Sequence, residues 1–160
     1  MNKHVKLATF GAGCFWGVEA RFRALPQVLD ATSGYMGGHL SQPDYAAVCT
    51  GTTGHAEVVQ VRFDSHQVSY DTLLARFFDL HNPTTMNRQG PDVGSQYRSV
   101  IFFHTVAQEE TARQAILDAD RSGRWPNPLV TQVQAAMTFW PAEEYHQRYL
   151  EKNGLGSCPI

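Results

Sequence analysis

The spacing of apolar positions predicts short strands separated by helices and irregular loops. Runs that are rich in β-branched and aromatic residues, or that alternate between apolar and polar residues, are typical of strands. They occupy residues 4–10, 27–38, 55–64, 97–103 and 127–137, and the second of them runs into a glycine-rich turn. The predicted strands therefore recur along the whole chain.

Helices are predicted between these strands, where apolar residues recur with a period of about 3.6. Three apolar stripes mark them: Phe15, Val18, Phe22 and Leu25; Leu73, Leu74, Phe77 and Phe78; and Ala112, Ala115, Ile116 and Ala119. Thr105 and Gln108 have the spacing of a capping box before the third stripe. Pro141 suits the first turn of a fourth helix, which we expect to continue through Leu150.

Two long segments lack either pattern and are predicted to be loops. Residues 38–54 have room for one helical turn, and residues 81–96 are rich in proline, glycine and asparagine. Long loops of this kind are often functional. Because strands and helices alternate imperfectly, we expect an α+β fold rather than a regular doubly wound sheet. The specific prediction is a two-layer sandwich with a ferredoxin-like core, forming a single domain over residues 1–160.

Composition excludes several classes of protein. The chain has 160 residues, 42% of them hydrophobic, and a formal net charge of −2. It therefore carries no strongly basic surface for nucleic acid or membrane. No apolar run approaches the roughly 20 residues that span a bilayer. The N-terminal residues show no secretory signal pattern, so we expect a cytoplasmic protein, and a monomer is the default expectation.

The three cysteines indicate thiol chemistry or simple burial. They are Cys14, Cys49 and Cys158. An odd number without a secretory signal argues against a disulfide scaffold, and the chain has no pair with the spacing of a zinc site. We therefore expect no bound metal.

The glycines around Cys14 allow two interpretations. Gly11, Gly13 and Gly17 follow a predicted strand and open a predicted helix, as in a dinucleotide-binding turn. However, the second interval is one residue too long, and Phe15 would obstruct the approach of a pyrophosphate. The other interpretation is a cysteine presented at a helix N-terminus, where free backbone N–H groups and the helix dipole stabilise a thiolate.

Glu57 is the acid suggested by the strand pattern. It shares one face of the predicted strand with Val59, Val61 and Phe63, so that face is largely apolar. A carboxyl group at the entrance of such a face is partly desolvated, which raises its pKa and favours the neutral form. The pattern alone leaves open a glutamate that faces solvent at the strand end.

Four segments together resemble the peptide methionine sulfoxide reductase A family. They are GCFWG at 13–17, DYAAVCTGTTGHAEVV at 44–59, HNPTTMNRQGPDVGSQYRS at 81–99 and AEEYHQRYL at 142–150. The resemblance covers nearly the whole chain, and the segments follow the order of the family.

The resemblance implies an enzyme that repairs oxidative damage by reducing the S epimer of methionine sulfoxide, free or in proteins, to methionine. The family's cysteine thiolate attacks the sulfoxide sulfur and becomes a sulfenic acid. A second cysteine then condenses with it to form a disulfide. Thioredoxin, or another dithiol, restores the thiols, and no cofactor is bound.

Site roles carry over by the same resemblance. Cys14 matches the nucleophile and Glu57 the acid, whereas Tyr45 and Tyr97 match the hydrogen-bond donors to the sulfoxide oxygen. A phenol suits an oxygen that gains negative charge. From spacing alone, both tyrosines could equally be core or rim residues.

The remaining roles concern substrate binding and the second thiol. Phe15 and Trp16 match the aromatic floor that receives the methyl group, and Asp92 matches a substrate-binding acid that could also form a turn. Cys158, in a C-terminal tail expected to be mobile from about residue 152, matches the resolving cysteine. Cys49 is interpreted as a buried bystander.

Three histidines are expected to have supporting roles, and two other functions stay open. His146 is interpreted as structural or supporting, and His55 and His81 as residues that orient loops. A thiol hydrolase or acyltransferase that uses Cys14 with a histidine base stays open as an alternative. So does a redox-sensing or peptide-binding module in which oxidation of Cys14 and Cys158 is the output.

Overall fold

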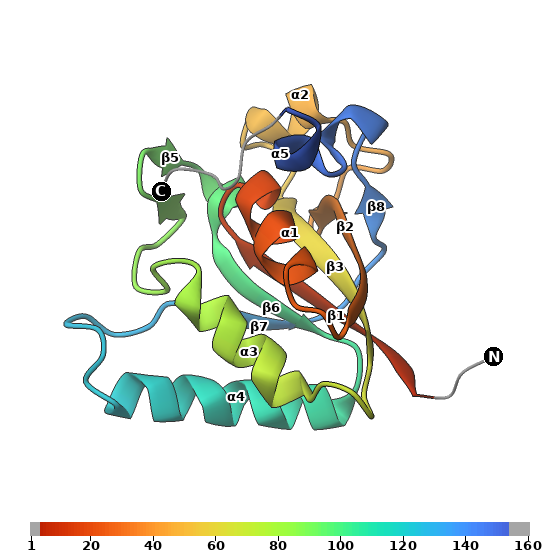
Figure 1. Cartoon of the computed structure of the whole chain (residues 1–160). Coiled ribbons are helices and arrows are strands. Elements are labelled where there is room, and N and C mark those ends of the chain that lie inside the picture. The colour runs from red at the N-terminus through yellow and green to blue at the C-terminus, as the bar shows by residue number, and fades with distance from the viewer. Residues whose placement is uncertain (1–3, 154–160) are drawn as a thin grey trace.

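A computed structural model describes residues 4–153, and its centre is a six-stranded sheet (Figure 1). The strand order is β7-β6-β1-β3-β2-β8. The strands are β1 (Val5–Ala12), β2 (Val28–Met36), β3 (Ala56–Asp64), β6 (Ser99–Phe103), β7 (Gln132–Ala135) and β8 (Trp140–Pro141). They coincide with the five predicted runs, except that β8 was not expected.

The four central strands have the order of a ferredoxin-like fold, which confirms the predicted class. β3 lies between β1 and β2 and is antiparallel to both, while β6 is antiparallel to β1 on its other side. β7 adds a parallel strand beside β6, and β8 extends the opposite edge beside β2. A parallel neighbour needs a crossover connection, and the helix α4 (Val106–Arg121) provides it.

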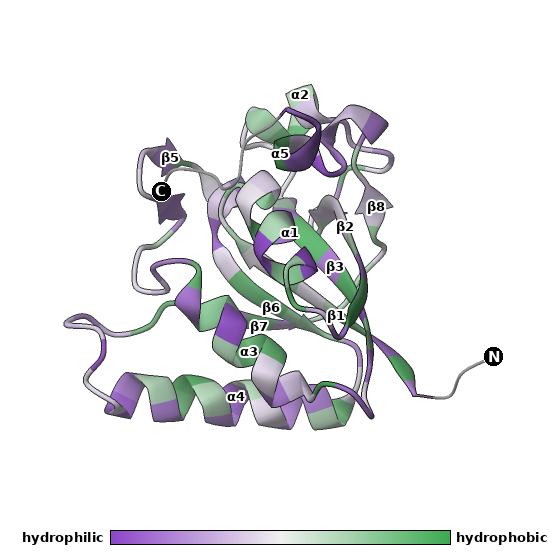
Figure 2. Ribbon diagram, viewed as in Figure 1, coloured by the Kyte–Doolittle hydropathy of each residue, from purple (hydrophilic) through white to green (hydrophobic). Residues whose placement is uncertain are grey.

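Three helices cover one face of the sheet (Figure 1). They are α1 (Phe15–Arg23), α3 (Tyr70–Asp79) and α4. The Thr105 side chain accepts a hydrogen bond from the Gln108 N–H, as the capping box predicts. The Gln108 side chain accepts from the His104 N–H instead of from Thr105, so only half of the box is present. Figure 2 shows hydrophobic and hydrophilic residues alternating along α4, as expected of a helix lying on a core.

Hydrophobic residues are buried on both faces of the sheet. The larger cluster joins the helices to the sheet and includes Phe10, Phe22, Val61, Phe77 and Ile101. The smaller cluster lies on the other face and consists of Met36, Ala56, Val58, Val100 and Phe102, with Ala136 and Phe139 against it. The molecule is therefore a two-layer sandwich with a second, small core behind one end of the sheet.

The predicted helix from Pro141 to Leu150 is wrong. Pro141 lies in the edge strand β8, opposite Gly34, where its missing N–H costs no ladder bond. Only two short helical pieces follow, the 3₁₀ helix η2 (Glu144–His146) and α5 (Tyr149–Lys152). Between them Arg148 has a φ of +54°, a left-handed conformation that interrupts a helix.

Both predicted loops contain short elements. The first holds α2 (Tyr45–Cys49), with Asp44 as its N-cap. The second holds a hairpin of β4 (Arg88–Gln89) and β5 (Asp92–Val93), followed by the 3₁₀ helix η1 (Ser95–Tyr97). Figure 1 shows α2, α5 and the hairpin near the end of the sheet where α1 begins. Candidate residues of the sequence analysis come from α2, the hairpin and η1, and from the start of α1 and of β3.

Candidate active site

Cys14 lies in the tight turn between β1 and α1. It is the N-cap residue of α1, so the first N–H groups of the helix are close to its side chain. Gly13 before it has a φ of +96°, and a Cβ there would lie 2.9 Å from the Gln89 Cγ. Only glycine fits both constraints without strain. The turn therefore places a half-buried thiol at the positive end of a helix, as the sequence predicts.

Glu57 is buried on β3, with 1% of its surface exposed. One carboxyl oxygen, Oε1, accepts a hydrogen bond of 3.2 Å from the N–H of Phe15, the residue after Cys14. The other oxygen, Oε2, is buried and has no partner among residues 4–153. Burial raises the pKa of this carboxyl from 4.5 to about 8, against the Phe15 bond that lowers it, and Asp92 adds to the rise. Glu57 is therefore a neutral acid at pH 7, with a proton available at Oε2.

Tyr97 and its neighbours show that the predicted residues gather in one place. Tyr97 is half-buried in η1, and burial raises its pKa. The charged neighbours that raise it further are, in order, Glu57, Cys49, Asp92 and Cys14. Tyr45, the first residue of α2, has its pKa raised by burial and then by a hydrogen bond with Cys49 and the charge of Glu57. Both phenols therefore keep their proton and can donate it to an acceptor.

Phe15 and Trp16 form an aromatic wall beside Cys14. Phe15 is 1% exposed and its ring lies 5.7 Å from that of Tyr35 and 6.3 Å from that of Tyr45. Trp16 is half-buried and stacks on Tyr149 with a centroid distance of 3.8 Å. Phe15 is thus a core residue, as its position in the apolar stripe predicts, and it also contributes to the aromatic wall.

His146 supports this wall more directly than the sequence indicated. It is 1% exposed, and its Nδ1 accepts a 2.9 Å hydrogen bond from the Trp16 indole N–H. Burial lowers the pKa of His146, although the charge of Glu143 opposes the shift. The ring is therefore neutral and carries its proton on Nε2, a buried atom without a partner in the described part of the chain.

Glu143 is a site residue that sequence reasoning missed. Its Oε1 accepts a 2.9 Å hydrogen bond from the Tyr35 hydroxyl, and its Oε2 accepts a 3.0 Å bond from the Tyr45 N–H. Partial burial favours the neutral acid, but these bonds outweigh it and lower the pKa. Glu143 therefore joins the C-terminal segment to the first residue of α2. The residues lie about a hundred positions apart, so only the fold could show their contact.

Cys49 is exposed, so the expectation that it is buried is wrong. It is the last residue of α2, a helix too short to bury both of its ends. Its thiol shares a hydrogen bond with the Tyr45 hydroxyl. Loss of water around the thiol raises its pKa, although the bond with Tyr45 lowers it.

His55 and His81 orient loops, as the sequence analysis expected. His55 Nδ1 accepts from the Gly38 N–H, and its Nε2 donates to the Leu40 carbonyl. His81 Nδ1 donates to the Phe77 carbonyl, and its Nε2 lies 2.7 Å from the Ser99 hydroxyl. Burial lowers the pKa of His81 to about 4, so this ring is neutral.

Cys158 lies outside the described residues, as does the predicted tail beyond residue 153. Within residues 4–153 no group of three histidine, cysteine or acidic side chains could hold a metal ion. No helix in that range is long and apolar enough to cross a membrane.

Comparisons with known proteins agree with the resemblance seen in the sequence. The family model described as peptide methionine sulfoxide reductase matches residues 6–160. The MsrA protein of Methanoculleus marisnigri is 57% identical over 157 residues, which cover 98% of this chain and 96% of that protein. The MsrA protein of Geobacter sulfurreducens is also 57% identical, over 98% of this chain and 97% of that protein.

Solved structures have the same fold. Methionine sulfoxide reductase A of Corynebacterium diphtheriae superposes with a TM-score of 0.91 at 34% identity, covering 99% of this chain and 79% of that one. Reduced Mxr1 of Saccharomyces cerevisiae has a TM-score of 0.90 at 36% identity, covering 99% and 91%. Mxr1 has also been solved in complex with Trx2, and that structure matches with a TM-score of 0.66 at 25% identity, covering 100% and 90%.

Proposed function

Because the chain belongs to the peptide methionine sulfoxide reductase family, we propose that it reduces the S epimer of methionine sulfoxide, free or in proteins, at the site built around Cys14 and Glu57. Methionine sulfoxide reduction itself follows from the family, which makes the protein an oxidoreductase. The observation that carries the mechanism is the pairing of these residues. The neutral, buried acid is bonded to the backbone N–H that follows the cysteine.

The first step joins the thiolate to the substrate sulfur. Cys14 attacks the sulfoxide sulfur, and the proton of Glu57 passes to the sulfoxide oxygen as negative charge develops there. Tyr45 and Tyr97 donate hydrogen bonds to the same oxygen. The S–O bond of the substrate then breaks, oxygen passes to Cys14 as a sulfenic acid, and methionine leaves. Sulfoxide sulfur is reduced by two electrons while the cysteine sulfur is oxidised by two.

The aromatic wall explains the choice of epimer. The methyl group packs on Phe15 and Trp16, while Tyr149 and His146 hold the Trp16 ring in place. Exchanging oxygen and methyl would put the oxygen against aromatic rings and leave the phenol donors unpaired. Asp92 lies close enough to Glu57 to raise its pKa, which supports a role in keeping the acid protonated as well as in binding substrate.

The second half of the cycle removes the sulfenic acid. The Cys158 thiol attacks the Cys14 sulfur, a disulfide forms and water leaves. A thioredoxin-type dithiol then reduces the disulfide by exchange and becomes oxidised itself. The complex of the related Mxr1 with Trx2 supports this choice of reductant. A cytoplasmic location and a monomeric state remain predictions.

A single-turnover experiment tests the proposal. Reduced protein is mixed with excess racemic methionine sulfoxide without reductant, and the released methionine is quantified while disulfides are mapped by mass. One equivalent of methionine with a Cys14–Cys158 bond is expected. Methionine with Cys14 left as a sulfenic acid would contradict the role of Cys158. Absence of methionine would contradict the reaction itself and favour the hydrolase or sensor alternative.

A further inference from the structure

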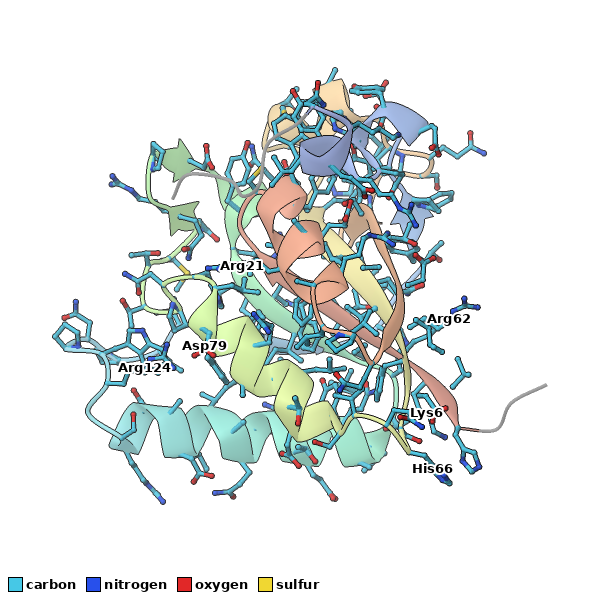
Figure 3. The ribbon with its side chains drawn as sticks, in the orientation of Figure 1. Lys6, Arg21, Arg62, His66, Asp79 and Arg124 are labelled. Carbon is cyan, nitrogen blue, oxygen red and sulfur yellow. The ribbon has the colours of Figure 1, made fainter. Side chains whose placement is uncertain are left out.

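An open groove lies beside α1, and the residues of the aromatic wall are not part of it. It has a volume of about 490 Å³, and its walls include Arg21, Asp79, Gln89, Gly90 and Trp125. We refer to it as the Trp125 groove. Figure 3 shows Arg21, Asp79 and Arg124 on the same side of the molecule, with Arg21 on α1 and Asp79 at the end of α3.

The Trp125 groove is separated from the turn that holds Cys14 by a single residue, Gln89. Gln89 forms part of its wall, and the Gln89 side chain also lies directly against Gly13. The same residue pairs with Asp92 in the β4–β5 hairpin. Strand β4 of this hairpin therefore lines the groove through Gln89, and strand β5 carries Asp92, the proposed substrate-binding acid.

The groove lies about three residues of extended peptide from the reacting sulfur. Arg21 follows Cys14 by seven positions on α1, which is about 10 Å along a helix axis at about 1.5 Å per residue. An extended peptide advances about 3.3 Å per residue, so about three residues cover that distance. A protein segment bound with its methionine sulfoxide at Cys14 would thus pass the groove.

Arg21 gives the groove wall a positive charge that no acidic side chain of residues 4–153 pairs with. Arg124 and Asp79 form an ion pair of 2.9 Å. Arg21 is exposed and has no ion-pair partner among residues 4–153. Arg88 is also exposed, and its Nε donates to the Gly90 carbonyl at the groove wall. Asp79 of the groove wall is therefore paired with Arg124, which leaves Arg21 available to an acidic ligand.

Trp125 adds an apolar surface between these charges. It is half-buried, with its ring 5.9 Å from that of Phe78 and the Arg124 guanidinium 4.6 Å from its centroid. These contacts restrain the ring, so little side-chain entropy is lost when a ligand packs against its exposed part. Arg21 suits an acidic side chain of a bound peptide, and Trp125 offers an apolar surface for the peptide beside it.

We propose that the Trp125 groove binds the peptide segment that flanks the methionine sulfoxide, and that Arg21 pairs with an acidic side chain about three residues away from it. The groove thereby favours oxidised acidic segments of proteins over basic ones. This inference rests on the proposed function, because it assumes that the sulfoxide binds at Cys14.

Peptide substrates test the proposal. Short glycine-rich peptides carry a central methionine sulfoxide with glutamate or lysine at the third position before or after it. Free methionine sulfoxide serves as a substrate without flanking residues. Arg21→Glu reverses the charge at the groove, and Arg62→Glu is the matched control. Arg62 is equally exposed on β3, and Figure 3 shows it far from Arg21 across the molecule.

Wild-type protein is expected to prefer a glutamate peptide over its lysine counterpart about three- to fivefold in kcat/KM, the range of an exposed ion pair. Arg21→Glu should reverse the preference, mainly through KM, and leave free methionine sulfoxide unaffected. Arg62→Glu should behave like wild type. Equal changes for both peptides, or a loss on free methionine sulfoxide, would overturn the proposal. If wild-type protein failed on every substrate, the proposed function itself would be contradicted.

Discussion

Replacing Glu57 by glutamine should stabilise the protein in alkaline solution while removing most of its turnover. The folded chain holds the carboxyl in a buried site where its pKa rises from 4.5 to about 8. Between these pH values the folded state keeps the proton and the unfolded state loses it. The free energy of unfolding of the wild-type protein therefore falls as pH rises through this window.

The size of the stability difference follows from the interval between the two pKa values. About 3.5 pH units correspond to about 5 kcal/mol at about 1.4 kcal/mol per unit. Most of this cost is present at pH 9, and about 3 kcal/mol is present at pH 7. Glutamine does not ionise, and its side-chain oxygen can still accept the Phe15 N–H bond, so the variant avoids the cost. Loss of the transferable proton should lower kcat by about 10²- to 10⁴-fold.

The free energies of unfolding of the wild type and Glu57→Gln are compared by urea unfolding of the reduced proteins at pH 5, 7 and 9. Tryptophan fluorescence follows the unfolding. Glu57→Gln should exceed wild type by less than about 1 kcal/mol at pH 5 and by several kcal/mol at pH 9. Glu110→Gln, an exposed change on α4, is the control and should show no such trend. His81, whose pKa is lowered to about 4, contributes equally to all three proteins and cancels. A difference that stays constant from pH 5 to 9 would refute the assignment of Glu57 as a neutral acid.

Three other substitutions test the geometry of the site. Gly13→Ala should lower stability by about 1–3 kcal/mol, because of its positive φ and the Gln89 side chain; an unchanged melting temperature would contradict the turn. Glu143→Ala should lower kcat/KM about tenfold because it releases Tyr45, whereas Glu143→Gln should recover part of this loss. Equal losses of kcat/KM for the two variants in steady-state assays would contradict a role of Glu143 in positioning Tyr45. Trp16→Phe removes the bond to His146 and should raise KM severalfold, and an unchanged KM would contradict the methyl-binding wall.

Much of the fold could be predicted from the sequence because its strands and helices are defined by local patterns. The alternation from Glu57 to Phe63 is buried as expected on β3, and the Phe15–Phe22 stripe faces the core. Segment 140–150 could not be predicted in this way. Its structure depends on β2, since Pro141 pairs with Gly34 and the Gln147 side chain bonds to the backbone of Ser33. Such distant partners override a proline that locally favours a helix start.

The candidate site likewise contains residues that local patterns indicated and residues that they did not. Cys14 and Glu57 carry local signals, a helix entry and an apolar strand face, so residue patterns made them candidates, and the family resemblance assigned their roles. The position of Glu143 beside Tyr45 has no local signal, because the two residues are 98 positions apart. The predicted burial of Cys49 failed because residue type says little about exposure at the end of a five-residue helix.

The attachment of segment 142–150 by side chains has a consequence for dynamics. Glu143, His146 and Gln147 connect it to distant segments, and no long ladder of backbone bonds runs through it. Amide hydrogens of this segment should exchange with deuterium well before those of β1 and β3. During refolding this segment should become ordered after β1 and β3, because contacts across more than a hundred residues form late. A chain caught with its sheet complete would therefore still lack His146 and Tyr149, the residues that hold the Trp16 ring beside Cys14.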